Sequence, residues 1–348
     1  MASSYPVFCC PQCKGPLKFG GEGYSCPQCA KRYPVVLGFP DFRVFSNTYI
    51  DHEDDYKKAE FLAEQSDKLD LKELVKLYYS ITPRVSKGRA ERFTRRMFAL
   101  VEKGLENLRE IEEVSKKRYR NRTVSNAVLE IGCGTGGFLV AAKDKFKYVV
   151  GIDIALRWLV ITSKRLNEFG LEVPLICGCA EYLPFEDGSF DLIVAEDVLE
   201  HVRDQEATLR ECHRVINKEG ILFLATPNRF SITPEPHAHV WGVGFLPRKW
   251  MNGYVKLIKG ISYEHHKVLS FFGLKMLLKK CSFQDHEILL PRIPEAELKS
   301  FSTFEKIQVA IYDLARKIPF IRAFLYIIGP FFHILCYANK DHGRGGES

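Results

Sequence analysis

The chain has 348 residues, of which 46% are apolar and 27% charged, and its 50 Lys and Arg outnumber 43 Asp and Glu. This composition is that of a globular protein and excludes collagen-like, low-complexity and disulfide-stapled miniature proteins. No run of about 18 uncharged apolar residues occurs, and residues 1–8 lack the cationic start and apolar core of a secretory signal. The eleven cysteines, an odd number with several in apolar surroundings, suit a reducing compartment, so we expect a cytoplasmic protein.

The first predicted unit, residues 1–42, contains two Cys-x2-Cys pairs separated by twelve residues. Four thiolates on two tight turns can surround a zinc ion tetrahedrally. A short β-rich segment without its own core needs a bound metal ion to stabilise its fold. Three residues separate Cys9 from Cys13, so only Cys10 has the two-residue spacing to Cys13. Because four sulfur ligands leave no open position, we predict a structural zinc ion. Its ligands are Cys10, Cys13, Cys26 and Cys29.

The second unit, residues 43–125, shows apolar residues at helical spacing and is predicted to be a helical connector. Within it, residues 84–122 contain thirteen Lys and Arg but only six Asp and Glu, so the whole positive excess of the chain lies in this stretch. A solvated helix face, a surface for anionic lipid and a surface for RNA are three interpretations of such a charge run.

The third unit alternates β-branched runs with helical stretches between residues 126 and 290. This alternation predicts a parallel sheet covered by crossover helices. The predicted strands are residues 128–131, 148–152, 173–177, 192–195 and 221–225.

A glycine-rich loop follows the first of these strands. Gly132, Gly134 and Gly136 allow a sharp turn and close approach of a ligand to main-chain N–H groups at the next helix start. Glu130 precedes the loop. Asp153 ends the second strand, where a carboxylate can hold both hydroxyls of a ribose.

Three further motifs follow in order: residues 178–185 (Gly-Cys-Ala-Glu-Tyr-Leu-Pro-Phe), 187–193 (Asp-Gly-Ser-Phe-Asp-Leu-Ile) and 196–202 (Glu-Asp-Val-Leu-Glu-His-Val). With them, residues 126–290 resemble class I S-adenosylmethionine-dependent methyltransferases, in the broad group that includes the quinone methyltransferases. Residues 1–42 likewise resemble zinc-ribbon modules that occur with methyltransferases. The resemblance implies a Rossmann-like, mostly parallel seven-stranded α/β sheet and S-adenosylmethionine as cofactor.

The same resemblance implies which residues bind the cofactor. The glycines would approach its methionine portion, Glu130 would order the loop or bind the amino group, and Asp153 would hold the ribose. Contacts around the adenine and the sulfonium would come from Ile154, Ala180, Glu181, Glu196 and Asp197.

His201 follows the fourth strand, beside the expected position of the transferred methyl group. A neutral imidazole there can act as base, or it opens the next helix and only makes local hydrogen bonds. Some quinone O-methyltransferases bind a metal through this Glu-His motif, and by that resemblance Asp197, Glu200 and His201 are a candidate metal set.

An insertion at about residues 227–268 follows the fifth strand. Ligands of such sheets bind beyond the carboxyl ends of the strands, so we expect an acceptor lid with His237 as its main catalytic candidate. The alternative is a packed surface lid whose histidines are incidental. His265 and His266 are predicted to be surface residues at the start of a helix over 270–280.

The remaining residues complete the predicted methyltransferase domain, 126–340. Residues 283–290 and 333–337 are the expected last two strands, a helix is expected from about Glu297, and residues 341–348 are expected to be a disordered tail. The apolar stretch within 305–338 either packs on the domain or contacts the inner face of a membrane, with cations such as Lys317 beside it.

The predicted function is methyl transfer to a small-molecule or lipid-like acceptor, at oxygen rather than carbon or nitrogen. A ribosomal or transfer RNA methyltransferase is the first alternative, since ribosomal-RNA guanine methyltransferases have a similar ribbon. However, Glu196-Asp197-Val198-Leu199 stands where a base-binding Asn-Pro-Pro-Tyr motif would be expected. The second alternative is a non-catalytic adapter that keeps the fold.

Overall fold

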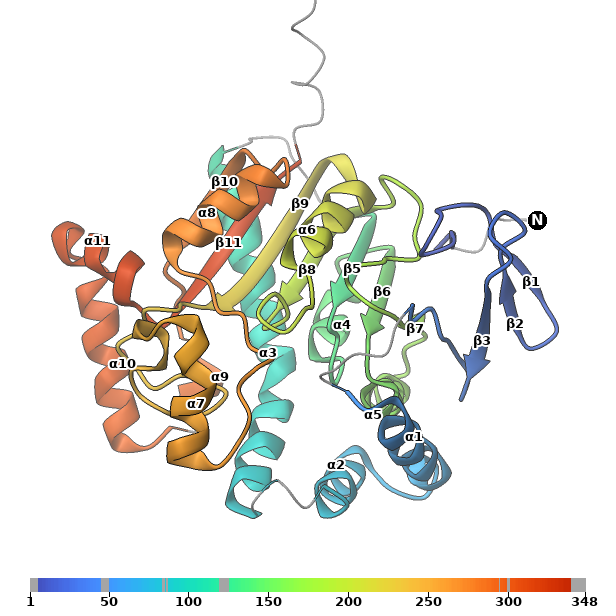
Figure 1. The fold of residues 1–348 in the computed structure, drawn as a ribbon, viewed down its shortest axis with the longest axis horizontal. Helices are drawn as coiled ribbons and strands as arrows, with labels where there is room; N and C mark the ends of the chain where they lie inside the picture. Colours follow the sequence, from blue (N-terminus) through green and yellow to red (C-terminus); the bar gives the residue numbers. More distant parts are fainter. Residues whose placement is uncertain are drawn as a thin grey trace, which may run out of the picture.

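The computed structural model describes residues 6–44, 50–82, 85, 87–118, 125–293, 295–298 and 301–338. They form a small four-stranded sheet at the N-terminus and a seven-stranded sheet with helices on both faces (Figure 1). None of the helices within these ranges is both long and apolar enough to cross a membrane.

The N-terminal sheet is antiparallel, in the order β1-β2-β3-β4. Its strands are β1 (Lys18–Gly20), β2 (Gly23–Ser25), β3 (Arg32–Val36) and β4 (Phe39–Pro40). The sheet is too small to enclose a core of its own, and its aromatic rings pack together against the larger domain: Phe8 lies 5.2 Å from Phe42 and 6.0 Å from Phe185, between ring centroids.

Main-chain hydrogen bonds attach this unit to one end of the large sheet. The N–H of Phe42 donates to the carbonyl of Cys177 at 2.8 Å, and the N–H of Cys9 donates to the carbonyl of Pro184 at 3.0 Å. β4 contacts β7, and Figure 1 shows the N-terminal sheet at the β7 end of the large sheet. The N-terminal unit, called the ribbon below, is therefore docked on the domain that contains the seven-stranded sheet.

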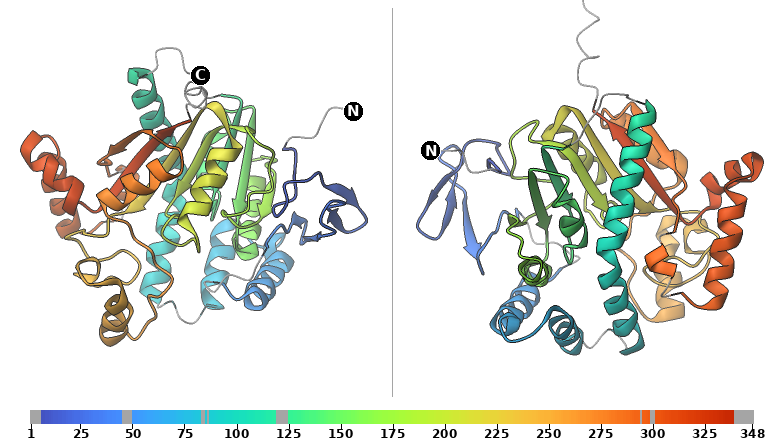
Figure 2. Two further views of the ribbon diagram at one scale, coloured as in Figure 1. Left: turned by 45° about the horizontal axis from the view of Figure 1, so that its top comes forward. Right: turned by 180° about the vertical axis from the view of Figure 1, so that it is seen from behind.

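Three helices follow: α1 (His52–Ser66), α2 (Leu71–Ser80) and α3 (Lys87–Arg118). Asp51 and Asp70 cap the first two, each accepting backbone N–H groups of the first turn. α3 runs along one face of the sheet (Figure 2). It packs closely on the start of the next helix, where a Cβ on Gly137 would lie 2.3 Å from Cβ of Leu100. The predicted connector is helical, and its helices form part of the layer that covers the sheet.

The large sheet has the strand order β10-β11-β9-β8-β5-β6-β7, in which β10 and β11 run antiparallel to their neighbours and the rest are parallel. This confirms the predicted Rossmann-like seven-stranded sheet. The strands are β5 (Ala127–Ile131), β6 (Tyr148–Asp153), β7 (Leu175–Cys177), β8 (Phe190–Glu196), β9 (Ile216–Pro227), β10 (Asp285–Leu289) and β11 (Phe331–Tyr337).

Helices α4 (Gly137–Ala142) and α5 (Leu156–Glu168) lie on the face that α3 covers, and α6 (Gln205–Val215) and α8 (Phe271–Lys280) lie on the other (Figures 1 and 2). The strands between them are almost fully apolar, which follows from burial on both faces. This arrangement places the carboxyl ends of the parallel strands at one edge of the sheet.

The segment after β9 contains a 3-10 turn, η1 (Val243–Phe245), and α7 (Arg248–Lys259), which share a small core that includes Val243 and Val255. The C-terminal part adds α9 (Glu295–Leu298), α10 (Thr303–Ala315) and α11 (Pro319–Ile328) before β11. Glu297, from which a helix was expected, lies within the short α9, and the longer α10 begins only at Thr303. The expected tail at 341–348 lies outside the described residues.

Candidate functional site

The glycine-rich loop turns sharply at the carboxyl end of β5. Gly132 has φ +70°, and a Cβ there would lie 2.5 Å from Cγ2 of Val198; Gly136 is the left-handed N-cap of α4. A side chain at Gly132 would therefore clash as well as strain the backbone. The loop borders a cavity of about 230 Å³ over β5, β6 and β8. Of the predicted cofactor residues, those that line it are Gly132, Gly134, Asp153, Ile154, Ala180, Glu181, Glu196 and Asp197.

Asp153 is fixed at the end of β6 by two main-chain donors. Its oxygens accept from the N–H groups of Gly134 and Ala155, both at 2.9 Å. Burial raises the pKa of this carboxyl despite these bonds. Each oxygen keeps a further lone pair, so the carboxylate can still accept from a diol in the cavity.

Glu130 is buried behind the loop, and its Oε2 has no hydrogen-bond partner among the described residues. Burial, followed by the nearby Glu196 and Asp153, raises the pKa of this carboxyl well above its usual value. A buried acceptor with nothing to accept is costly. The ammonium group of S-adenosylmethionine would satisfy it, so the unpartnered oxygen fits the cofactor.

Two other predicted acidic residues, Glu181 and Glu196, form hydrogen bonds or ion pairs with groups of the protein itself. Oε1 of Glu181 accepts from the N–H of Arg203 at 2.7 Å. Glu196 is paired with α3: its Oε2 lies 2.7 Å from Nζ of Lys103, and its Oε1 accepts from the amide of Asn107 at 2.5 Å. α3 therefore holds the carboxylate of Glu196, a residue of the cavity wall, in place. The sequence analysis missed both α3 residues, because nothing local places that helix there.

Asp197 has φ +53°, in the left-handed region that is uncommon for residues other than glycine. Its N–H donates to the carbonyl of Ala225 at 2.9 Å, so the neighbouring strand β9 holds this conformation. Such strain is typical of a site where a side chain must be aimed at a ligand.

Three histidines from distant segments meet beside this cavity. His201, which lines it, follows β8; His237 belongs to the lid; and His266 precedes α8. Their ring centroids are 4.5 to 5.2 Å apart. The helix expected over 270–280 is α8 (Phe271–Lys280), with Ser270 as its N-cap. The prediction that His266 is a surface residue was wrong, because its ring stacks on Tyr263 within the cluster.

Burial, followed by the neighbouring His237 and His266, lowers the pKa of His201 to about 3. The imidazole is therefore neutral at neutral pH. Because a general base works best when its pKa lies near the operating pH, His201 in this environment is a weak base. It also does not open a helix, since α6 begins only at Gln205.

The lid fixes His237 through a residue that the sequence analysis did not single out. Oε1 of Glu235 lies 2.5 Å from Nδ1 of His237, and its Oε2 accepts from the N–H groups of His237 and Ala238 at 2.9 and 2.6 Å. The Glu-x-His spacing is the only local signal for this arrangement. The bond between Glu235 and Nδ1 holds the ring of His237 in one orientation.

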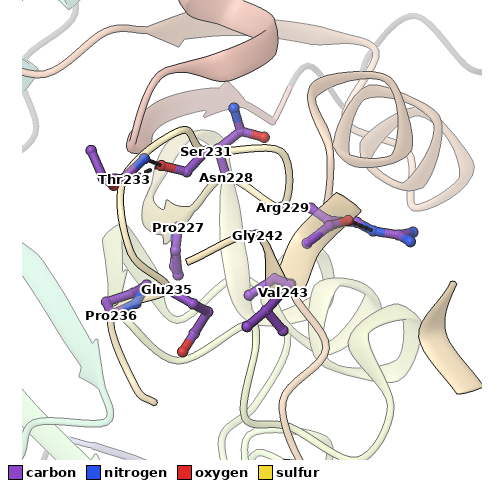
Figure 3. A pocket seen from close by; sticks show the side chains of 11 residues that line it. Pro227, Asn228, Arg229, Ser231, Thr233, Glu235, Pro236, Gly242 and Val243 are labelled. Atoms are coloured by element: carbon purple, nitrogen blue, oxygen red, sulfur yellow. Dashed lines mark hydrogen bonds between the residues drawn. The ribbon is translucent and has the colours of Figure 1, made fainter. Parts of the chain in front are cut away.

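The lid loop also encloses a second, much smaller cavity, drawn in Figure 3 with the side chains of Ser231, Thr233 and Val243 around it. Its volume of about 10 Å³ is no more than one water molecule needs. The loop is thus internally packed, with Oγ of Ser231 accepting from the N–H of Thr233 at 3.0 Å. The cavity over β5 and β6 is therefore the larger of the two.

The four predicted zinc ligands converge at the tip of the N-terminal sheet. Their sulfur atoms all lie within 4.8 Å of one another, with Cys10 and Cys29 at 3.5 Å and Cys13 and Cys26 at 3.4 Å. Sulfurs around a tetrahedral zinc ion are about 3.8 Å apart, so the donor set fits that ion. Cys9 is directed elsewhere, with its thiol on the carbonyl of Phe185.

Comparison with known proteins agrees with this geometry. Residues 129–224 match the family described as "Methyltransferase domain". The chain is 26% identical to a ubiquinone biosynthesis O-methyltransferase of Idiomarina loihiensis over 55% of this chain and 74% of that one. It is 34% identical to the protein of the same name from Pseudomonas aeruginosa, over 33% of this chain and 48% of that one.

Most curated relatives shown by this comparison are matched over about half their length. Among solved structures, a putative methyltransferase from Bacillus halodurans is 18% identical with a TM-score of 0.42, over 67% of this chain and 99% of that one. The family match falls on the strands and loops that build the cavity, and the strand order is that expected for the family. The chain therefore carries a class I S-adenosylmethionine-dependent methyltransferase domain.

Proposed function

We propose that the protein transfers the methyl group of S-adenosylmethionine to an oxygen atom of a lipid-like acceptor. The observation that carries the proposal is the cavity over β5 and β6, where Asp153 can accept from the ribose. Behind its glycine loop, Glu130 has a buried oxygen without a partner among the described residues, which could accept from the ammonium group. Bound S-adenosylmethionine supplies a methyl carbon on a positive sulfur. The acceptor oxygen would replace the sulfur on that carbon, with S-adenosylhomocysteine as the leaving group and the hydroxyl proton passing to solvent water.

The residues of the chain orient the two reactants and exclude water. α3 holds the cavity residue Glu196 through its pair with Lys103, and the lid places His237 beside His201. Orientation of this kind supplies much of the rate in a transfer between two bound groups. The O-methyltransferase names of the relatives support oxygen as the acceptor atom.

Exposed apolar side chains support a lipid-like acceptor. They lie on α7, α10 and α11, at the end of the molecule away from the ribbon (Figure 1). Large apolar patches on a surface mark interaction sites. The most exposed of these side chains are Leu257, Phe320, Phe304, Ile311, Leu314, Trp250, Ile307 and Phe324.

Exposed cations accompany this apolar surface, including Lys256 and Lys259 on α7 and Lys306 and Arg322 on α10 and α11. An apolar face with cations beside it binds the interface of an anionic membrane. We propose that these helices contact a membrane surface, from which the acceptor reaches the lid. For the N-terminal unit we propose a structural zinc ion on its four cysteines.

Neither alternative is favoured by the described residues. Part of the basic stretch is used within the chain: Lys103 pairs with Glu196, and Arg118 pairs with Asp285 and Glu287 of β10. The intact cavity argues against a non-catalytic adapter.

The test is incubation of the purified protein with methyl-labelled S-adenosylmethionine and either a lipid extract or total RNA. We expect label in the lipid fraction, released by the chemistry that cleaves methyl ethers or esters. Label in RNA, in a reaction that weakens steeply with salt, would contradict the proposal. Absence of S-adenosylhomocysteine binding in calorimetry would contradict the donor assignment itself.

A further inference from the structure

We propose that His201, His237 and His266 form a binding site for a divalent transition metal ion of the zinc class, separate from the four cysteines. One ring nitrogen from each histidine lies within 4.8 Å of the others. Nitrogens bound tetrahedrally to zinc are about 3.4 Å apart. Small rotations of the three rings would therefore bring them onto one ion.

Local turns hold two of the histidines, and a main-chain hydrogen bond joins their segments. The N–H of His201 donates to the carbonyl of Val198 at 2.9 Å in the turn after β8. His266 is held by stacking on Tyr263, with ring centroids 4.7 Å apart and planes 9° from parallel. Next to His266, the N–H of Lys267 donates to the carbonyl of Glu200 at 2.7 Å, which ties this segment to the turn of His201.

His237 has the arrangement that metal-binding histidines share. Its Nδ1 is hydrogen bonded to the carboxylate of Glu235 at 2.5 Å, and Glu235 is itself buried and fixed by two main-chain donors. A carboxylate on the far nitrogen fixes the tautomer and makes the other nitrogen a better ligand. Nε2 of His237 is therefore the ligand atom.

An independent observation also points to a cation at this place. Glu200 is fully buried, and its Oε1 has no hydrogen-bond partner among the described residues, although its Oε2 accepts from the hydroxyl of Thr226 at 3.1 Å. Oε1 lies 3.7 Å from Nε2 of His237. A buried carboxylate oxygen without a donor is stabilised by a positive ion. An ion bound to the three histidines would supply the positive charge that Oε1 of Glu200 lacks.

Three protein nitrogens leave one position of a tetrahedral ion open, as in zinc enzymes and unlike the four-sulfur site. His201 lines the donor cavity, so that position is accessible to an acceptor oxygen. If the proposed methyl transfer holds, the ion would bind this oxygen and ease loss of its proton. Only this role rests on the proposed function; metal binding does not.

The experiment measures metal content and no enzymatic activity. The full-length protein and its His237→Asn and His239→Asn variants are reconstituted with zinc, freed of unbound ion and analysed for zinc per chain. His239 is an exposed residue of the same loop, and asparagine tolerates its positive φ. We expect His237→Asn to hold one zinc equivalent fewer than the wild type and His239→Asn to match the wild type. Equal zinc in the wild type and His237→Asn would overturn the proposal.

Cobalt gives a second measurement on the wild type alone, which remains decisive if the lid variant fails to fold. Thiolate ligands produce a charge-transfer band on Co²⁺ that imidazole ligands do not. We expect a second bound Co²⁺ whose visible bands appear without further growth of the thiolate band. A titration that ends with the thiolate-bound ion would overturn the site. Failure of the proposed methyl transfer would leave both results unchanged.

Discussion

Nζ of Lys14 in the ribbon lies 2.6 Å from Oε2 of Glu211 on α6, a contact between residues 197 positions apart. The same oxygen accepts from the N–H of Leu183 at 2.8 Å, and Arg214 lies 2.8 Å from the other oxygen. Glu211 therefore connects the ribbon, the loop after β7 and α6. Burial by itself would raise the pKa of this carboxyl, but the bonds from Arg214 and Lys14 outweigh it, and the pKa is lowered.

This pKa shift makes part of the stability depend on pH. Because the folded pKa lies below the unfolded value of about 4.5, Glu211 contributes stability above that value, and the contribution is lost as pH falls through the folded pKa. We expect Glu211→Gln to lower the free energy of unfolding by about 1–2 kcal/mol at pH 7. Urea unfolding of both proteins should show this difference shrinking below about pH 4.5; a difference that stays constant would contradict the role of the charge.

Asp153→Ala should weaken binding of S-adenosylhomocysteine by about 10- to 100-fold, because it removes the acceptor for the ribose hydroxyls. Calorimetric titration measures the affinity, and the thermal unfolding curve shows that the domain is still folded. Asp144→Ala, at an exposed position on the same domain, is the matched control. Unchanged affinity in Asp153→Ala would show that the cofactor lies elsewhere.

Cys26→Ser should lose the zinc ion of the ribbon, since three sulfurs cannot close the tetrahedron as tightly as four. Cys9→Ser is a close control, because Cys9 adjoins Cys10 but its thiol donates to the carbonyl of Phe185. Zinc per chain is the measurement. Loss of metal in Cys9→Ser, or its retention in Cys26→Ser, would require a different ligand set.

Replacing Phe320 and Phe324 of α11 by serine should reduce binding to vesicles that contain anionic lipid by about tenfold or more, given the apolar area removed. Sedimentation with the vesicles measures the bound fraction. Phe19→Ser removes a similarly exposed ring from the ribbon and should have no effect. Equal losses in both variants would mean that the contact is not specific to α11.

The sequence predicted the sheet well because each strand is a local feature. The run at 128–131 is flanked by polar and glycine residues, and its strand ends within one residue of the predicted bounds at either end. Asp153 and the glycines could also be placed, because they follow directly from the ends of these strands.

Contacts between distant segments could not be predicted in the same way. Lys103 reaches Glu196 only because α3 crosses the sheet, and a periodic apolar pattern gives no position for a helix in space. His266 was misplaced for the same reason: its helix-start surroundings looked exposed, whereas the lid folds back over it. Glu235 was missed because its importance lies in a bond to His237 that only the turn creates.

Docking of the ribbon has one more consequence for the sheet. β7 is its terminal strand, and the bridge between Asp41 and Cys177 occupies part of that edge. An uncovered edge of this kind offers unpaired main-chain groups to a strand of another molecule. The N-terminal unit thus covers part of this edge, and we expect a chain truncated before residue 50 to aggregate through β7 even if its cofactor cavity forms correctly.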